Sequence, residues 1–265
     1  MPEARVLVIL PTLGDRLETL RETLDSVALQ RRDIDLTLVV VAPASALAAR
    51  AMAAEHDAVV VDDPRAGISA AINRGISART GEEFYAWIGD DDLYRPGGLA
   101  RLAAILDEHP DAPLAFGGCD YIDPEGRTIV VSNAGRLATI LLAWGPDLIP
   151  HPGTMIRLDP LVSAGAFDES LRFAMDLDIF LTLRSFGRFR WTREIVSAFR
   201  WHPDSLTVSS RLSSSLESEA VKKRHLPAIL RPVSPLWQRP VRWASARAAL
   251  SLNRRAIRGR STGVI

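Results

Sequence analysis

Short apolar runs alternate with amphipathic segments through roughly the first 90 residues, and this alternation constrains the fold more than any other feature. The apolar runs are the length of buried strands, and the amphipathic segments carry apolar residues at helical spacing, as Leu17, Leu20 and Leu24 do. The pattern predicts strands at Arg5–Leu10, Leu36–Val41, Ala58–Val61 and Phe84–Ile88, and helices at 15–30, Ala44–His56 and Ile68–Ser77. Buried strands separated by helices are typical of an α/β protein with a mainly parallel central sheet and helices on both faces.

The pattern changes in the second half of the chain. Residues 112–131 predict a strand, a turn at Asp123–Gly126 and a strand that returns antiparallel. Beyond them we predict a short strand at 151–157, a helix at 176–187 that ends at Gly187, and a last β region at 189–202. A nucleotide-binding half is therefore expected to join a mixed half within one domain.

Charge separates this domain from the C-terminal segment. The formal net charge is zero, yet residues 211–265 hold twelve Lys and Arg against two Glu, a net of about +10. We predict a catalytic domain at 1–208 and a basic helical extension at 209–265, with the serine-rich stretch 209–219 as a candidate hinge. Segregated charge predicts an electrostatic role for the extension.

Composition excludes several classes of protein. A hydrophobic content of 47% supports a sizeable core. The single cysteine, Cys119, excludes an intramolecular disulfide and a cysteine-rich zinc site, and it suits a reducing compartment. The N-terminal apolar run is too short for a signal peptide, and no stretch approaches the roughly 20 apolar residues that span a bilayer. We expect a cytoplasmic protein, soluble or peripheral at the inner face of the membrane.

Three consecutive aspartates, Asp90, Asp91 and Asp92, follow the apolar run Phe84–Ile88 directly. Like charges repel, and burying them without partners costs free energy. They can form a solvated acidic turn before a helix, or they can hold a cation. Open α/β sheets bind ligands at the carboxyl ends of their strands, where both this cluster and the segment 11–15 lie, and this favours the cation.

The order of these motifs resembles the family 2 glycosyltransferases of the GT-A fold, over about residues 5–208. In this chain, "VILPTLGDRLETLRETLDSVALQ" resembles the family's opening strand, Pro-Thr turn and helix. The stretch "AGISAAINRGISARTGEEFYAWIGDDD" resembles the run that leads into the family's acidic motif. The later segments "HPGTMIR", "FDESLRFAMDLDIFLTLRSFG" and "FRWHPDSLT" follow in the family's order. The resemblance implies an inverting enzyme that uses a nucleotide-diphosphate sugar as donor.

The resemblance also implies a metal site. Alignment of the family's acidic motif onto residues 89–92 gives Asp91 the metal-ligand position, with Asp90 second and Asp92 in support; Gly89 stands where the family usually has its first Asp. Mg²⁺ or Mn²⁺ would bridge these carboxylates to the diphosphate and stabilise the leaving group. The resemblance gives His202 a further contact with the metal or diphosphate, although an isolated histidine after an aromatic strand is as often a packing residue.

Other residues are expected to bind the donor. By resemblance, Pro11, Thr12 and Leu13 line the base pocket, and Gly67 and Asn73 belong to a donor-side motif. The family often has acidic residues after the second strand, where this chain has Ala42 and Pro43. Asp62 and Asp63 are the substitutes, with a solvated Asx turn before Pro64 as the alternative. Arg200 is expected to bind phosphate as a fixed cation.

Inversion requires a base that removes the proton of the acceptor hydroxyl. Asp176 matches the family's base position, with Met175 where Glu is more common. The alternative is that Asp176 or Asp178 only occupies the first turn of a helix, where the helix dipole favours acidic residues. His151 is expected to line the acceptor pocket.

The C-terminal segment allows two interpretations. Between Pro240 and Arg258, apolar residues including Trp243 fall near one helical face and arginines near another, which favours an anionic membrane surface as partner. The alternative is a helix packed on the catalytic domain or on a partner subunit. Binding to nucleic acid ranks low because no recognition motif accompanies the charge.

These observations predict a metal-dependent, hexosyltransferase-type enzyme whose acceptor is a saccharide or lipid-linked saccharide of a cell-surface polymer. A nucleotidyltransferase would need a glycine-rich, basic triphosphate loop near the first strand, which the segment 11–18 lacks. The other alternative is a catalytically degenerate protein that keeps the fold and binds nucleotide sugars without turnover.

Overall fold

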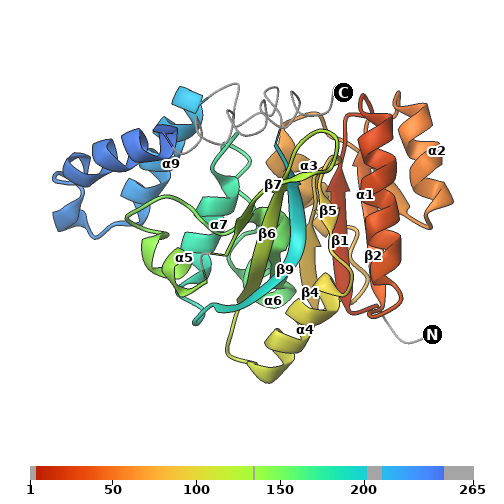
Figure 1. Cartoon of the computed structure of the whole chain (residues 1–265), viewed down its shortest axis with the longest axis horizontal. Coiled ribbons are helices and arrows are strands. Elements are labelled where there is room, and N and C mark those ends of the chain that lie inside the picture. The colour runs from red at the N-terminus through yellow and green to blue at the C-terminus, as the bar shows by residue number, and fades with distance from the viewer. Residues whose placement is uncertain (1–3, 134, 202–210, 248–265) are drawn as a thin grey trace, which may run out of the picture.

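The structure is a computed structural model that describes residues 4–133, 135–201 and 211–247. Within these residues one sheet runs in the order β3-β2-β1-β4-β8-β6-β9-β5, with β7 paired to β6 (Figure 1). Its strands are β1 (Val6–Pro11), β2 (Leu36–Ala42), β3 (Val59–Asp62), β4 (Phe84–Trp87), β5 (Leu93–Tyr94), β6 (Leu114–Ile122), β7 (Thr128–Ser132), β8 (Thr154–Arg157) and β9 (Arg190–Arg200).

Helices connect most of these strands. They are α1 (Leu17–Gln30), α2 (Leu47–Glu55), α3 (Ile68–Ile76), α4 (Gly98–Glu108), α5 (Arg136–Leu141), α6 (Leu158–Ser163), α7 (Met175–Leu183) and α9 (Arg211–His225). Two 3-10 turns, His151–Gly153 and Ala228–Leu230, and a helical stretch at 235–247 complete the described part.

The sheet has a parallel half and a mixed half, as predicted. β1 pairs in parallel with both β2 and β4, and β3 pairs in parallel with β2. β8 then runs antiparallel to both β4 and β6, whereas β9 is parallel to β6 and antiparallel to β5. The carboxyl ends of β1 and β4 therefore meet at one edge, which places the segments after Pro11 and Trp87 next to each other.

The core forms two layers, one on each face of the sheet. Along β1, Val6, Val8 and Leu10 pack with side chains of α1, α2 and α4, while Leu7 and Ile9 pack with α3, α6 and α7. Alternate residues of a strand point to opposite faces, so a run of continuous apolar residues is buried only when both faces are covered. The helices on both faces confirm this part of the prediction.

Two predicted boundaries were wrong. The helix predicted to end at Gly187 ends at Leu183. Gly187 has a different role, because a Cβ atom there would lie 2.1 Å from the carbonyl oxygen of Asp111. The stretch 209–219 is not a hinge where the structure describes it, since residues from Arg211 onward form α9. Serines can be accommodated in a helix whose position is fixed by packing and by side-chain contacts.

α9 lies next to α7, at the end of the molecule away from α1 and α2 (Figure 1). The buried Lys222 of α9 donates a hydrogen bond to the carbonyl oxygen of Gly145, which anchors the helix to the loop after α5. Trp237 contacts Trp144 of the same loop, with ring centroids 5.4 Å apart. In the described part of the chain, no helix has the length and apolar character needed to cross a membrane.

Candidate active site

The acidic loop lies at the carboxyl edge of the sheet, beside the segment that follows β1. Thr12 is buried, and its hydroxyl donates a hydrogen bond to Oδ2 of Asp90 at 2.6 Å. This contact joins two segments that are 78 residues apart in sequence. The structure thus brings together the predicted base-pocket segment and the predicted metal loop.

The three aspartates have different surroundings. Burial raises the pKa of Asp90 to about 6, although Thr12 and Arg16 favour its ionised form. Asp91 forms an ion pair with Arg16, whose guanidinium also lies 3.7 Å from Asp90. Asp92 is 1% exposed, and its carboxylate accepts hydrogen bonds from the backbone N–H of Arg200 at 2.9 Å and from His151 at 3.2 Å. Asp90 and Asp91 therefore both lie against the Arg16 guanidinium, whereas the carboxylate of Asp92 is held by His151 and the backbone of Arg200.

His151 connects the acidic loop to β4. Its Nε2 atom lies 3.2 Å from Oδ2 of Asp92, and its ring stacks on the indole of Trp87 with centroids 4.3 Å apart. Burial alone would lower the pKa of His151, but the hydrogen bond to Asp92 raises it overall. His151 was expected to line the acceptor pocket, and it does border the cleft described below.

Asp176 lies in the first turn of α7 and faces Trp87. The indole Nε1–H of Trp87 donates to Oδ1 of Asp176 at 3.1 Å. Burial raises the pKa of Asp176, while His151 and the Trp87 hydrogen bond act in the opposite direction. A carboxylate with a raised pKa holds a proton more strongly than a solvated one, as a general base requires.

Asp178 faces a different part of the molecule. Its carboxylate contacts His225 at 2.8 Å and Arg224 at 3.3 Å, both on α9. The two acidic residues of this turn therefore have separate partners, and Asp176 alone of the two lines the cleft.

Arg200 holds the acidic loop from behind. Its side chain is 3% exposed, and Nε donates to the carbonyl oxygen of Asp91 at 2.9 Å. Nη1 donates to the carbonyl oxygen of Pro124 at 2.6 Å, and Nη2 forms an ion pair with Glu22. All three nitrogens are thus engaged by the protein, and its phosphate-binding role stays a prediction that would require these contacts to rearrange.

The predicted donor-side residues lie around α3. Gly67 precedes α3 with φ +109°, a conformation that favours glycine. The side-chain amide of Asn73 donates to the backbone C=O of Phe167 and accepts from its N–H. Oδ1 of Asp63 accepts the backbone N–H of Arg65 at 2.8 Å, the contact of an Asx turn, and Leu13, after β1, is largely exposed. Their roles in donor binding stay predictions, and His202 lies outside the described residues.

A cleft of about 690 Å³ begins at Asp176 and His151 and extends to the C-terminal helices. The side formed by residues 121–201 carries aromatic rings, and the other side carries hydroxyl, amide and charged groups of α9 and residues 238–245. The lining includes Tyr121, Phe199, Trp201, Ser218, Lys222 and Arg242. Aromatic faces combined with hydrogen-bonding groups suit a polyhydroxylated ligand.

Sequence reasoning missed Trp87 and the cleft wall formed by α9. The sequence carries only a weak signal for Trp87, which is that an aromatic residue ends a buried strand just before an acidic loop. No local pattern indicated the wall formed by α9, because its contacts through Glu217 and Lys222 join residues 45 and 77 positions apart.

The acidic loop could bind a divalent cation whose coordination sphere is completed by ligands from outside the protein. Asp90 and Asp91 offer carboxylate oxygens, which Mg²⁺ and Mn²⁺ prefer, and a cationic guanidinium already lies between them. Among the residues described, no three His, Cys, Asp or Glu side chains form a group that could hold a metal alone. A cation there would need phosphate oxygens and water to fill its coordination sphere.

Comparison with known proteins identifies relatives by sequence. The family model "Glycosyl transferase family 2" matches residues 7–156, more than half of the chain. An uncharacterized glycosyltransferase of Rickettsia typhi is 25% identical over 162 residues, which cover 58% of this chain and 50% of that protein. One from Rickettsia felis is 24% identical over 145 residues, 52% of this chain and 24% of its own length. The chain thus spans half or less of these relatives.

Solved structures confirm the fold. S. aureus TarS 1–349 in complex with UDP-GlcNAc has a TM-score of 0.63 at 17% identity, covering 83% of this chain and 66% of the TarS 1–349 chain. The mannosyltransferase PcManGT from Pyrobaculum calidifontis, in complex with GDP-Man and Mn²⁺, has a TM-score of 0.63 at 18% identity, covering 99% of this chain and 76% of its own. The predicted GT-A fold is therefore confirmed.

Proposed function

We propose that this chain, which belongs to glycosyltransferase family 2, transfers a sugar from a nucleotide-diphosphate donor to a saccharide or lipid-linked acceptor and inverts the configuration at the anomeric carbon. Family membership establishes sugar transfer in general terms. The donor, the acceptor, the metal and the catalytic residues named here are our proposal, as is a hexosyltransferase role in the synthesis of a cell-surface polysaccharide.

One observation carries the assignment of residues. Trp87, on β4, donates a hydrogen bond to Asp176 and stacks on His151, which in turn binds Asp92. The candidate base and the acidic loop are thus connected through the buried Trp87 and the largely buried His151. Such coupling supports a single site in which the acceptor lies beside Asp176 and the donor diphosphate beside Asp91.

The proposed step is a single displacement. The acceptor hydroxyl oxygen attacks the anomeric carbon of the donor sugar and gives its proton to the Asp176 carboxylate. The bond between that carbon and the diphosphate oxygen breaks, and the nucleoside diphosphate leaves with the electron pair. Attack from the face opposite the leaving group accounts for inversion.

The acidic loop would hold Mg²⁺ or Mn²⁺ through Asp91, with Asp90 as a second ligand. The bound cation would stabilise charge on the leaving diphosphate. Asp92 supports this loop from behind, because both of its carboxylate oxygens are occupied by His151 and the backbone of Arg200.

The donor nucleotide is proposed from the structural relatives. The TarS structure contains UDP-GlcNAc, and the PcManGT structure contains GDP-Man with Mn²⁺. UDP- and GDP-sugars are therefore the first donors to test, with Pro11, Thr12 and Leu13 placed by our proposal around the base.

The C-terminal segment has features that suit binding to an anionic membrane surface. Leu216, Leu236 and Trp243 are exposed, and basic side chains such as Arg239 and Arg247 lie among them. Sedimentation with phosphatidylglycerol vesicles should be salt-sensitive and reduced in Leu236→Ser/Trp243→Ser, while phosphatidylcholine vesicles should bind little. Equal binding to both kinds of vesicle would contradict this role. The boundary between residues 208 and 209 stays a prediction.

The donor site can be tested by thermal shift. UDP-, GDP- and dTDP-sugars would each be added with Mn²⁺, Mg²⁺ or EDTA to the wild type, to Asp91→Ala and to Glu108→Ala, an exposed control on α4. Ligands that bind only the native state raise the melting temperature. We expect a metal-dependent shift for one nucleotide, kept in Glu108→Ala and lost in Asp91→Ala. No shift with any donor would contradict the proposed donor site.

A further inference from the structure

We propose that Glu217 of α9 is a positioning residue for sugar transfer: it holds the turn that carries Asp176, so that the C-terminal segment is part of the catalytic machinery. This inference rests on the proposed function. It concerns a residue that lies outside every motif described for the catalytic domain, and outside the matched range 7–156.

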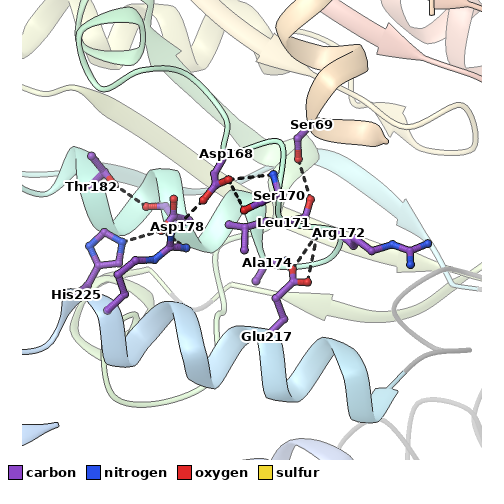
Figure 2. Close-up of polar contacts among 11 residues, drawn as sticks. Ser69, Asp168, Ser170, Leu171, Arg172, Ala174, Asp178, Thr182, Glu217 and His225 are labelled. Carbon is purple, nitrogen blue, oxygen red and sulfur yellow. Dashed lines mark hydrogen bonds and ion pairs between the residues drawn. The ribbon is translucent and has the colours of Figure 1, made fainter. Parts of the chain in front are cut away.

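Glu217 binds three consecutive backbone N–H groups immediately before α7. Its carboxylate accepts hydrogen bonds from Arg172 at 3.1 Å, Phe173 at 2.7 Å and Ala174 at 2.8 Å. Figure 2 shows Glu217 reaching from α9 toward Arg172 and Ala174. Ala174 is the residue that precedes α7, and it has no side-chain cap of its own. The carboxylate therefore holds the backbone that leads into α7, and it binds the N–H of the N-cap residue, which the glutamate of a capping box binds in other helices.

The position of this contact makes it relevant to the chemistry. Asp176 lies two residues beyond the last N–H group that Glu217 binds. The backbone of residues 172–174 thus determines where α7 begins and how its first turn is oriented. A shift of about 1 Å in a reacting group can reduce catalysis roughly a hundredfold, so fixing this turn has a direct consequence for the base.

The opposite side of the same segment is held by the donor-side helix. Ser69 of α3 donates to the carbonyl oxygen of Leu171 at 3.1 Å, and Asn73 binds the backbone of Phe167. Figure 2 shows Ser69 and Glu217 approaching this segment from different elements. The base-bearing turn therefore bridges α3, which borders the proposed donor site, and α9, which borders the acceptor cleft.

A second set of contacts allows the positioning of the Asp176 turn to be tested apart from the attachment of α9 to the rest of the fold. Toward the far end of α9, about 10 Å along the helix axis from Glu217, Arg224 pairs with Asp168 at 2.9 Å and with Asp178. These ion pairs also attach α9 to the domain, but they do not involve the N–H groups before α7. Arg224→Gln is therefore a control that weakens docking and leaves the Glu217 contact in place.

The experiment compares wild type, Glu217→Gln and Arg224→Gln as full-length proteins. Glutamine keeps the size of the side chain and removes its charge. Hydrogen exchange of the peptide covering residues 170–178 is measured first, because it needs no substrate. We expect faster exchange of Arg172, Phe173 and Ala174 in Glu217→Gln than in either other protein.

Kinetics with the donor found by thermal shift form the second part. We expect Glu217→Gln to lower kcat at least tenfold with the donor KM and the donor-induced thermal shift unchanged, and Arg224→Gln to stay within about twofold of wild type. Equal kcat in Glu217→Gln and wild type, or equal losses in both variants, would overturn the inference. Absence of transfer in the wild type would instead contradict the proposed function, while the exchange result would still test the contact itself.

Discussion

The imidazole of His151 stacks on the indole of Trp87 with ring centroids 4.3 Å apart and planes inclined by 13°. One edge of this pair reaches Asp92 in the acidic loop, and the other reaches Asp176 at the start of α7. The pair therefore fixes the distance between the proposed metal loop and the proposed base. A change in either ring should affect catalysis more than it affects binding of the donor.

Trp87→Phe removes the indole N–H and keeps an aromatic ring for His151. Burial raises the pKa of Asp176 and the Trp87 hydrogen bond opposes that rise, so its loss should raise the pKa further. Because the base must be ionised, the acidic limb of the kcat–pH profile should move to higher pH. A hydrogen bond is worth about 0.5–1.5 kcal/mol, so the limb should move by roughly 0.4 to 1 pH unit, and kcat at a pH on that limb should fall roughly 2- to 10-fold.

The control for this change is Trp191→Phe, at a partly exposed tryptophan that packs near Gly135, away from the cleft lining. Its pH profile should match that of the wild type. An acidic limb that stays in place in Trp87→Phe would contradict the assignment of Asp176 as the base that Trp87 binds.

Asp90→Asn should stabilise the metal-free protein above pH 6. The pKa of Asp90 is raised to about 6, against about 3.9 in an unfolded chain, so the folded state binds this proton more tightly. That contribution is fully present below about pH 3.9 and is lost as the pH rises through 6. Two pKa units correspond to at most about 3 kcal/mol, and the lost pairing with Arg16 reduces the gain.

Melting temperatures measured in EDTA from pH 4 to pH 8 test this. We expect Asp90→Asn to melt a few degrees above the wild type at pH 7.5 and to converge with it near pH 4. Glu108→Gln, an exposed substitution on α4, should follow the wild type throughout. A lower melting temperature for Asp90→Asn across the whole range would show that its hydrogen bond from Thr12 outweighs the cost of its burial.

Arg200→Lys should be strongly destabilising. The buried guanidinium binds Asp91, Pro124 and Glu22 through three separate nitrogens, and a single ammonium cannot reach all three. Losing partners of a buried charge costs about 3–5 kcal/mol. Urea denaturation should detect this, whereas Arg101→Lys, at an exposed ion pair with Glu194, should cost less than about 1 kcal/mol. Similar losses in the two variants would contradict the role given to Arg200.

The first half of the fold could be predicted because its signal is local. β1, β2 and β4 are continuous apolar runs followed or preceded by helical spacing, and such runs are stable only in a sheet covered on both faces. The end of α7 and the start of α9 could not be predicted in this way. Gly187 permits a close approach to the carbonyl oxygen of Asp111 and does not mark the end of α7, and α9 is held to a distant loop through Lys222.

The site divides along the same line. The acidic loop and Asp176 are predicted as site residues from short motifs and their order, which the resemblance to a family makes specific. Trp87 and Glu217 act through contacts with residues 89 and 43 to 45 positions away, so no neighbouring residue in the sequence reports them. Arg200 shows what the sequence does not indicate: a cation near an acidic motif is predicted to bind phosphate, and its contacts with Asp91, Pro124 and Glu22 become visible only in the fold.

Release of nucleoside diphosphate from the donor that passes the thermal-shift screen tests the central claim most directly. It would be measured with metal present in the wild type, Asp176→Asn and Asp91→Ala. We predict metal-dependent release by the wild type, a loss of about 10²- to 10⁴-fold in Asp176→Asn with the thermal shift retained, and loss of both release and shift in Asp91→Ala. Release by Asp176→Asn at the wild-type rate would contradict the account, because the proton of the acceptor would then leave by another route.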